Sequence, residues 1–295
     1  MFGLLLLDKP VGLSSNRALQ RAKHLFAAAK AGHAGSLDPL ATGMLPVFFG
    51  AATRLAAFML EARKTYRVTA RLGLATTTGD AEGETTEDRS SAPAPGAAAI
   101  AAAVGRFVGE IDQVPPMYSA LKRGGVPLYR LARAGVEVER SARRVLIEEL
   151  TVERYAWPDL ELHVRCSKGT YVRTLVEDIA RAAGTVGHVA ALRRLTVSPF
   201  AEQGMRTFAE LEAAAAEGPA ALDRLLLPAE AALEGWPSAY LDSAEAAKLA
   251  HGQAVPADPA LPCGQVKVYA DAGQLIAIGL VTTEHRLTPT RVFIR

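Results

Sequence analysis

The segment AGHAGSLDPLATGML, residues 31–45, constrains the fold of this 295-residue chain more than any other segment. It holds Gly32, Gly35 and Gly43 within twelve residues, and glycine permits backbone angles and close approaches that other residues forbid. Its single carboxylate, Asp38, precedes a proline, and an Asp-Pro pair can simply begin a helical turn. The density of glycine favours instead a shaped loop pressed against another part of the molecule, and such loops often carry a site.

The apolar pattern predicts a mixed α/β fold in two domains. Strand candidates lie at 3–8, 44–49, 65–74, 145–155 and 160–168, and helix candidates at about 14–29, 51–60, 96–105, 170–184 and 207–217. These elements do not follow a regular βαβ rhythm, so a mixed sheet with helices is favoured over a doubly wound parallel sheet. Short strands at 264–271, 274–281 and 290–294 predict a small β domain. We therefore expect domains at 1–235 and 236–295.

The apolar runs and the cysteines indicate the cellular compartment of the protein, and the histidines bear on metal binding. Asp8 and Lys9 break the apolar opening before it reaches the length of a secretion signal, and no later segment has eighteen uninterrupted apolar residues. Cys166 and Cys263 lie far apart without C-x-x-C spacing, which indicates free thiols in a reducing compartment. The six histidines are scattered, so no metal site is predicted. We expect a cytoplasmic protein that does not bind membranes.

Positive charge is concentrated in three segments, although the net charge of the chain is only +2. Residues 54–71, 117–144 and 168–194 together carry a net charge of +12, and the rest of the chain carries −10. Residues 79–88, GDAEGETTED, contribute five acids and no base to that deficit. If the basic segments share a face, they form a surface for phosphate groups; otherwise they are solvated charges on unrelated elements.

Four separated segments contain the side chains that could perform chemistry. They are LLLLDKPVGLSS at 4–15, GHAGSLDPLATGML at 32–45, KTYRV at 64–68 and CSKGTYVRTL at 166–175. An apolar strand that ends in Asp, as the first segment does, also begins the aspartyl-phosphate phosphatases. Those enzymes need a second Asp two residues later, and Pro10 occupies that position here. The phosphatase interpretation is therefore disfavoured.

Taken in order, the four segments closely resemble the TruB family of pseudouridine synthases, bacterial enzymes that isomerise uridine in the T-loop of tRNA. The resemblance covers most of residues 3–200, and GHAGSLDPLATGML is its most specific element. It implies the pseudouridine synthase fold, a mixed and largely antiparallel sheet with flanking helices. The carboxy-terminal part, 236–295, resembles a PUA-type RNA-binding domain in size and strand pattern.

The resemblance implies that Asp38 is the catalytic nucleophile. Moving uracil from an N1 link to a C5 link breaks and re-forms the glycosidic bond, and a carboxylate can hold one fragment covalently meanwhile. There is no net redox change or hydrolysis, so no cofactor is expected. Apolar surroundings would raise the pKa of the carboxyl group, and a fixed cation must offset this effect. Arg173 matches the family's arginine that pairs with the aspartate.

The resemblance assigns roles to four further residues. Tyr66 matches the tyrosine that stacks on the target base, and its hydroxyl could assist proton transfer at C5. Tyr171 and Leu192 match positions that complete the uridine pocket. His33 matches a histidine that meets the RNA where the flipped nucleotide departs. Without the resemblance, each of these residues would be interpreted as part of the core or of a helix.

The implied substrate is uridine-55 of tRNA, recognised through the T-arm stem-loop, and we expect a monomer. The target base lies in a folded loop and must be swung out before Asp38 can reach it. A rival hypothesis is a catalytically silent RNA-binding protein that remodels tRNA with the same surface. The combination of Asp38, Arg173 and Tyr66 favours the enzyme, because binding alone gains nothing from a buried carboxylate near phosphates.

Overall fold

A mixed, largely antiparallel sheet forms the body of the protein, which confirms the expected fold class. The computed structural model describes residues 2–271 and 273–293, and seven strands pair in the order β1-β3-β12-β4-β11-β10-β7, with β2 beside β3. Their bounds are β1 (Gly3–Lys9), β2 (Ala31–His33), β3 (Thr42–Phe49), β4 (Lys64–Leu72), β7 (Gly109–Gln113), β10 (Arg143–Ala156), β11 (Asp159–Cys166) and β12 (Gly187–Val197). All these pairs are antiparallel except β12 with β3.

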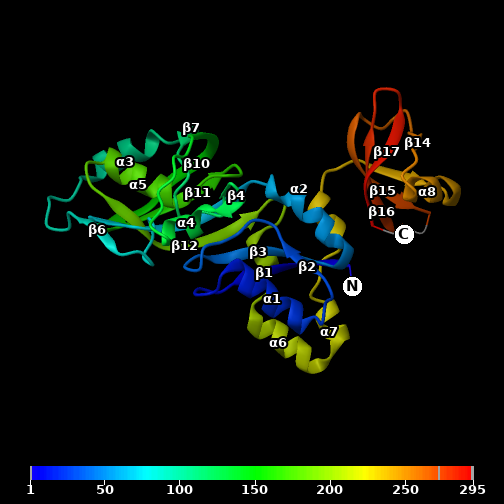
Figure 1. The fold of residues 1–295 in the computed structure, drawn as a ribbon, viewed down its shortest axis with the longest axis horizontal. Coiled ribbons are helices and arrows are strands. Elements are labelled where there is room, and N and C mark those ends of the chain that lie inside the picture. Colours follow the sequence, from blue (N-terminus) through cyan, green and yellow to red (C-terminus); the bar gives the residue numbers. More distant parts are fainter. Residues whose placement is uncertain (1, 272, 294–295) are drawn as a thin grey trace.

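Helices cover the sheet in two groups (Figure 1). α1 (Ser15–Leu25), α6 (Phe208–Glu217) and α7 (Pro219–Asp223) share a core with β1 and β3, whereas α3 (Ala97–Gly105) and α5 (Val172–Ala182) share one with β4, β10, β11 and β12. Leu5 and Leu7 of β1 face α1, while Leu4 and Leu6 belong to a third core on the other face. The unbroken apolar run at the start of the chain is explained by this burial on both faces.

Shorter elements connect the main strands. They are η1 (Gly50–Leu55), α2 (Ala56–Leu60), β5 (Leu74–Thr76), β6 (Thr85–Asp88), β8 (Lys122–Arg123), β9 (Val126–Pro127), α4 (Leu128–Arg133), η2 (Glu202–Gly204) and η3 (Ala229–Leu233). The acidic stretch 79–88 runs into β6, which pairs with β5 as a hairpin on the surface. Of the basic segments, 117–144 contains β8, β9 and α4.

The end of the chain forms a second sheet, in the order β13-β15-β16-β17-β14, packed with α8 (Ser243–Ala250). Its strands are β13 (Ser238–Leu241), β14 (Val255–Pro256), β15 (Gly264–Ala270), β16 (Leu275–Val281) and β17 (Arg286–Val292). The strand expected at 290–294 begins earlier, at Arg286, and residue 294 lies outside the described residues. β13 and β14 were not predicted, because strands this short give no clear alternation, and the helix α8 was not predicted either.

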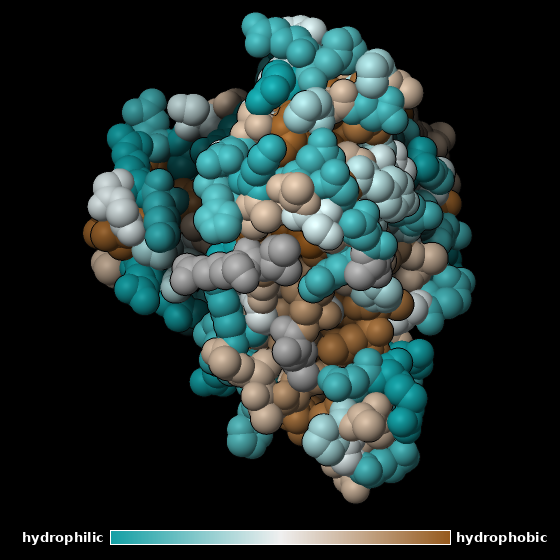
Figure 2. All heavy atoms as spheres, turned by 90° about the vertical axis from the view of Figure 1, so that its right-hand side faces the viewer, coloured by the Kyte–Doolittle hydropathy of each residue, from teal (hydrophilic) through white to brown (hydrophobic). Residues whose placement is uncertain are grey.

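The second sheet lies beside α2 (Figure 1), where Trp236 meets Phe58 edge to face with ring centroids 5.2 Å apart. Ile278 of β16 belongs to the same core as Leu4 and Leu6 of β1. Figure 2 views the molecule from this side and shows hydrophilic residues over most of the face, with small apolar patches between them. Among the helices of the described residues, none has the length and hydropathy needed to cross a membrane.

Gly43 is required by the junction between β3 and β12. Its φ is +96°, and a β-carbon at this position would lie 2.2 Å from the carbonyl oxygen of Arg194. Gly43 is the register partner of Arg194 in the parallel pairing of β3 with β12. Any side chain would therefore separate the two strands. This close approach explains one of the three glycines that made the loop conspicuous in the sequence.

We predict that Gly43→Ala lowers the free energy of unfolding by about 3 kcal/mol or more, because backbone must move to admit the methyl group. Gly184→Ala is the matched control: Gly184 also has a positive φ, +83°, but a β-carbon there has no heavy atom within 4 Å. Gly184→Ala should lower the free energy of unfolding by only about 1–2 kcal/mol, the cost of placing an alanine in the left-handed region. Urea unfolding of both variants checks the difference, and equal losses would contradict the close-approach explanation.

Candidate active site

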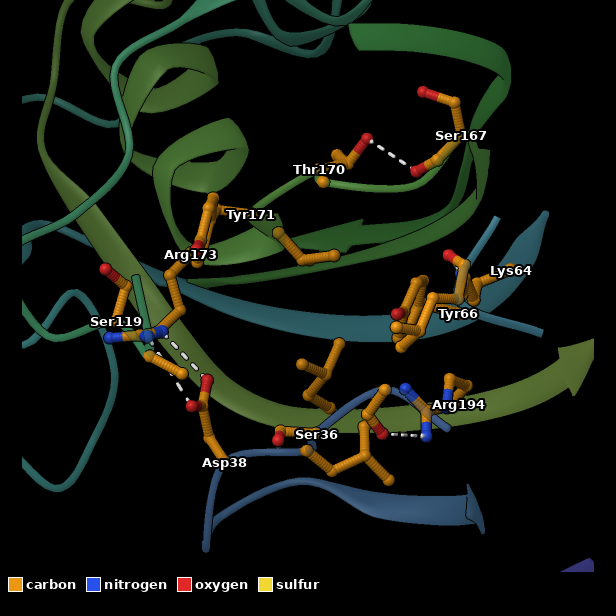
Figure 3. Close-up of a pocket in the computed structure, with 17 residues that line it drawn as sticks. Ser36, Asp38, Lys64, Tyr66, Ser119, Ser167, Thr170, Tyr171, Arg173 and Arg194 are labelled. Carbon is orange, nitrogen blue, oxygen red and sulfur yellow. Dashed lines mark hydrogen bonds and ion pairs between the residues drawn. The ribbon is translucent and has the colours of Figure 1, made fainter. Parts of the chain in front are cut away.

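A cavity of about 310 Å³ opens between the glycine-rich loop, β4, β12 and the start of α5. Its charged and aromatic side chains come from separate parts of the chain, as Figure 3 shows. They are Asp38 from the loop, Lys64 and Tyr66 from β4, Tyr171 and Arg173 from the start of α5, and Arg194 from β12. Ser36, Ser119 and Leu192 line it too. Five of the six residues expected in the site therefore meet in one cavity.

Asp38 and Arg173 form an ion pair at one end of this cavity. Nε of Arg173 lies 2.9 Å from Oδ2 of Asp38, and Nη2 lies 3.5 Å from Oδ1. The remaining donors are also engaged, since Nη1 donates to the carbonyl of Thr78 and Nη2 to that of Tyr118, both at 2.6 Å. The side chain of Arg173 is 6% exposed, whereas that of Asp38 is 41% exposed. The guanidinium is thus fixed, and the carboxylate faces the space that a ligand would fill.

Asp80 is a second carboxylate beside the same guanidinium, and the sequence analysis did not identify it. Its Oδ2 lies 3.7 Å from Nε of Arg173, and the residue is buried. Its Oδ1 accepts hydrogen bonds from the hydroxyl of Thr78 at 2.5 Å and the amide of Glu82 at 3.1 Å. Asp80 stands in the acidic stretch 79–88, where it looked like one of five solvated acids. Only its burial distinguishes it from its neighbours.

Opposing effects set the ionisation of Asp38. The pKa of its carboxyl group is raised above the ordinary value: burial has the largest effect and Asp80 adds to it, whereas Arg173 and Lys9 offset only part of the shift. Burial also lowers the pKa of Lys9 to about 8, a shift that Asp38 and Glu82 oppose. Lys9 is therefore mostly charged at neutral pH and supplies a second cation near Asp38. The site combines a carboxylate in partly apolar surroundings with cations that keep it ionised.

Side chains from the first segment hold the Asp38 loop in place. The hydroxyl of Ser15 accepts from the amide of Leu37 at 2.7 Å and donates to its carbonyl at 3.0 Å. Nζ of Lys9 donates to the carbonyls of Leu13 and Pro39 at 2.6 and 3.3 Å. No described helix begins at Asp38, so the helix-start interpretation of the Asp-Pro pair is wrong. Hydrogen bonds thus hold Leu37 and Pro39, the neighbours of Asp38 on either side, and the Asp38 side chain lines the cavity.

Tyr66, Tyr171 and Leu192 line the cavity. Burial raises the pKa of Tyr66, and nearby Arg194 opposes the shift. Arg194 is itself buried, and it donates to the carbonyls of Met44 and Gly35 at 2.7 and 3.1 Å. In the sequence, nothing in the segment VAALRRL, residues 189–195, distinguishes Arg194 from an ordinary strand arginine.

His33 lies outside the cavity, in β2. Burial lowers the pKa of its imidazole, and Arg194 lowers it further. Its Nδ1 is buried without a hydrogen-bond partner. A neutral imidazole next to the loop is therefore the form that this environment favours at neutral pH.

The three basic segments differ in how many of their positive charges have no acidic partner. In the first, arginines of and near β4 form ion pairs with acids of β10 and β11: Arg63 with Glu148, Arg67 with Glu153 and Arg71 with Asp159. In the second, Lys122, Arg130, Arg133 and Arg143 are exposed, and no ion pair is found for them among the described residues. In the third, 168–194, Lys168, Arg173, Arg181 and Arg193 are in ion pairs and Arg194 is buried. Positive charge available to a phosphate therefore lies mainly in 117–144, next to the cavity.

The cysteines and the acidic residues offer no metal centre. Within residues 2–271 and 273–293, no group of three or more His, Cys, Asp or Glu side chains is placed to hold an ion. Cys166 is buried and Cys263 is exposed, and both are free thiols. Burial raises the pKa of Cys166 to about 11, so this thiol is inert at neutral pH.

Three family models match successive parts of the chain. Residues 23–172 match the TruB family pseudouridylate synthase (N-terminal domain). Residues 173–234 match the tRNA pseudouridylate synthase B C-terminal domain, and 237–293 match the pseudouridine synthase II TruB C-terminal domain. The chain belongs to the TruB family, and it is a pseudouridine synthase, an isomerase.

Individual relatives cover nearly the whole chain. It is 50% identical over 291 residues to the tRNA pseudouridine synthase B of Pseudomonas aeruginosa (strain UCBPP-PA14), covering 98% of this chain and 95% of that protein. It is 49% identical over 298 residues to the protein of the same name from Burkholderia mallei (strain NCTC 10247), covering 99% and 97%. A chain in the crystal structure of a Cbf5-Nop10-Gar1 complex has a TM-score of 0.76 at 25% identity, covering 99% of this chain and 85% of that one.

We predict that Ser15→Ala lowers the free energy of unfolding by about 1–3 kcal/mol, because the buried amide and carbonyl of Leu37 lose their partner. Ser91→Ala is the matched control, since Ser91 is exposed, and it should stay within about 0.5 kcal/mol of the wild type. Urea unfolding midpoints measure both. Equal effects would show that Ser15 does not hold the loop.

Proposed function

We propose that this enzyme converts uridine-55 in the T-loop of tRNA to pseudouridine, with Asp38 as the nucleophile. The observation that carries the proposal is the ion pair of Asp38 with the buried Arg173 at the wall of a cavity large enough for a nucleoside. The relatives named tRNA pseudouridine synthase B support tRNA as the substrate.

The bonding change requires a group that retains one fragment. The N1–C1′ bond of uridine breaks, the base turns, and a C5–C1′ bond forms, while C5 loses a hydrogen and N1 gains one. The Asp38 carboxylate can attack either C1′ of the sugar or C6 of the base, and the fragment stays bound until the new bond forms. Arg173 keeps the carboxylate ionised for this attack, since its charge opposes the effect of burial on the pKa of Asp38.

Tyr66, Tyr171 and Leu192 form the proposed uridine pocket. In Figure 3, Tyr66 lies across the cavity from Asp38, so that a base between them could stack on its ring. Because burial raises the pKa of Tyr66, the phenol stays protonated at neutral pH and can donate a hydrogen bond during proton transfer at C5. We propose that His33, close to the loop but outside the cavity, contacts the RNA from which the base departs.

RNA binding must supply the energy to extrude the base. Extrusion costs a few kcal/mol, of which stacking on Tyr66 returns about 1–3 kcal/mol. The exposed cations of 117–144 can contribute the rest through phosphate contacts, which predicts salt-sensitive affinity. We propose that residues 1–235 are the catalytic domain and 236–295 an accessory PUA-like RNA-binding domain that acts on tRNA beyond the T-arm. One chain supplies all the residues that line the cavity, so the proposed reaction requires no second subunit.

We predict that Asp38→Asn abolishes turnover and leaves tRNA affinity within about tenfold of the wild type, because it removes the nucleophile but almost no volume. The assay is the release of the C5 hydrogen from labelled uridine in tRNA transcripts, with Asp112→Asn as an exposed-carboxylate control. A transcript with cytidine at position 55 should release nothing.

Three results would count against parts of the proposal. Hydrogen release by Asp38→Asn would reject the nucleophile, and release from the cytidine-55 transcript would reject the target position. Tight tRNA binding by the wild type without any release would favour the catalytically silent RNA-binding protein.

A further inference from the structure

A buried glutamine at the edge of the main sheet is hydrogen-bonded to the start of α5. Gln113 is the last residue of β7 and is 2% exposed, whereas the four residues before it are half-buried or exposed. Its side-chain amide makes two hydrogen bonds to one residue, Tyr171. Oε1 accepts from the backbone amide at 2.7 Å, and Nε2 donates to the carbonyl at 3.1 Å. A buried side-chain amide is costly unless it is paired, and both ends of this one are paired.

Tyr171 depends on an outside partner because of its place in the chain. It is the N-cap residue of α5, and within the described residues its side chain forms no capping hydrogen bond. Its backbone amide precedes the helix, so no helical carbonyl can accept from it. Its carbonyl accepts from the amide of Leu175 at 3.0 Å and has a second lone pair for Gln113. Gln113 therefore pairs with Tyr171 as a residue of a neighbouring antiparallel strand would.

Tyr171 and Arg173 both line the cavity, next to each other in Figure 3, but they are held differently. The carbonyls of Thr78 and Tyr118 bind the guanidinium of Arg173 directly. The ring of Tyr171 takes its direction from its backbone, which Gln113 holds at both the amide and the carbonyl. Loss of these two hydrogen bonds should therefore displace Tyr171 before it displaces Arg173.

Gln113 also stands where the basic segment leaves the sheet. The chain departs after Gln113 and returns at Arg143, its register partner in β10. The exposed cations of 117–144 lie between these two points, so the hydrogen bonds to Tyr171 join the base of that segment to the cavity wall. We propose, on the basis of the function proposed above, that Gln113 is a positioning residue. Through the backbone of Tyr171, it holds the Tyr171 ring in the wall of the uridine pocket.

A double-mutant cycle between Gln113 and Tyr171 tests this role. Single-turnover rates of C5 hydrogen release and dissociation constants for tRNA are measured for the wild type, Gln113→Met, Tyr171→Leu and the double variant. Methionine has nearly the volume of glutamine but forms neither hydrogen bond. Gln113→Met should lower the rate at saturating tRNA about ten- to a hundredfold, because small displacements spoil the reacting geometry. Its dissociation constant should stay within about threefold of the wild type, since phosphate contacts dominate that affinity.

The double variant separates positioning from general damage to the fold. If Gln113 acts through Tyr171, the double variant should be at most about threefold slower than Tyr171→Leu, because the ring to be positioned is already absent. Gln20→Met, at an exposed glutamine of α1, is the matched control and should keep the wild-type rate. If Gln113→Met does not fold, Gln113→Glu takes its place in the cycle. It keeps an acceptor for the Tyr171 amide and, when ionised, has no donor for the carbonyl.

A wild-type rate in Gln113→Met, or rate losses that multiply in the double variant, would overturn the positioning role. Failure of the wild type to release the C5 hydrogen from tRNA would instead overturn the proposed function. The two failures are distinguishable, since the first leaves the wild-type enzyme active.

Discussion

The ion pair between Asp38 and Arg173 is the interaction on which the arrangement of the site depends. Arg173 is buried at the start of α5, and its guanidinium also binds the carbonyls of Thr78 and Tyr118. A buried guanidinium is tolerated only when its donors are satisfied, and here three chain segments satisfy them. The pair therefore does more than attract two charges. It ties the glycine-rich loop, the β5–β6 hairpin and the basic segment 117–144 to one helix, next to one cavity.

A second constraint joins the two halves of the sheet. β3 carries the loop of Asp38 at its start, and β12 carries Leu192 and Arg194; the two strands meet in parallel at Gly43, where no side chain fits. Arg194 then spans the junction by donating to carbonyls of Met44 and Gly35. The separation of Asp38 from the Tyr66 end of the cavity follows from this junction. Backbone geometry and buried arginines thus set the dimensions of the cavity.

The sequence predicted those parts of the fold and site that local patterns encode. The apolar run at 3–8, the alternation at 65–74 and the glycine-rich loop each correspond to an element, and five of the six expected site residues share a cavity. Asp80 was missed because its place beside Arg173 comes from burial against residues distant in the chain, which no local pattern reports. Similarly, no local pattern reports that Arg63, Arg67 and Arg71 of the segment 54–71 are paired with acids of β10 and β11.

We propose that Arg173 keeps Asp38 ionised for attack, and the pH dependence of the single-turnover rate measures this effect. The rate should fall as the pH falls through the pKa of Asp38, because only the carboxylate is nucleophilic. Lysine at position 173 would keep the positive charge but lack the planar guanidinium that fixes two parallel N–H groups against the carboxylate, so the pKa of Asp38 should rise in Arg173→Lys. The acidic limb of the rate profile is therefore expected to move to higher pH in this variant. An acidic limb at the same pH in both enzymes would contradict this proposal.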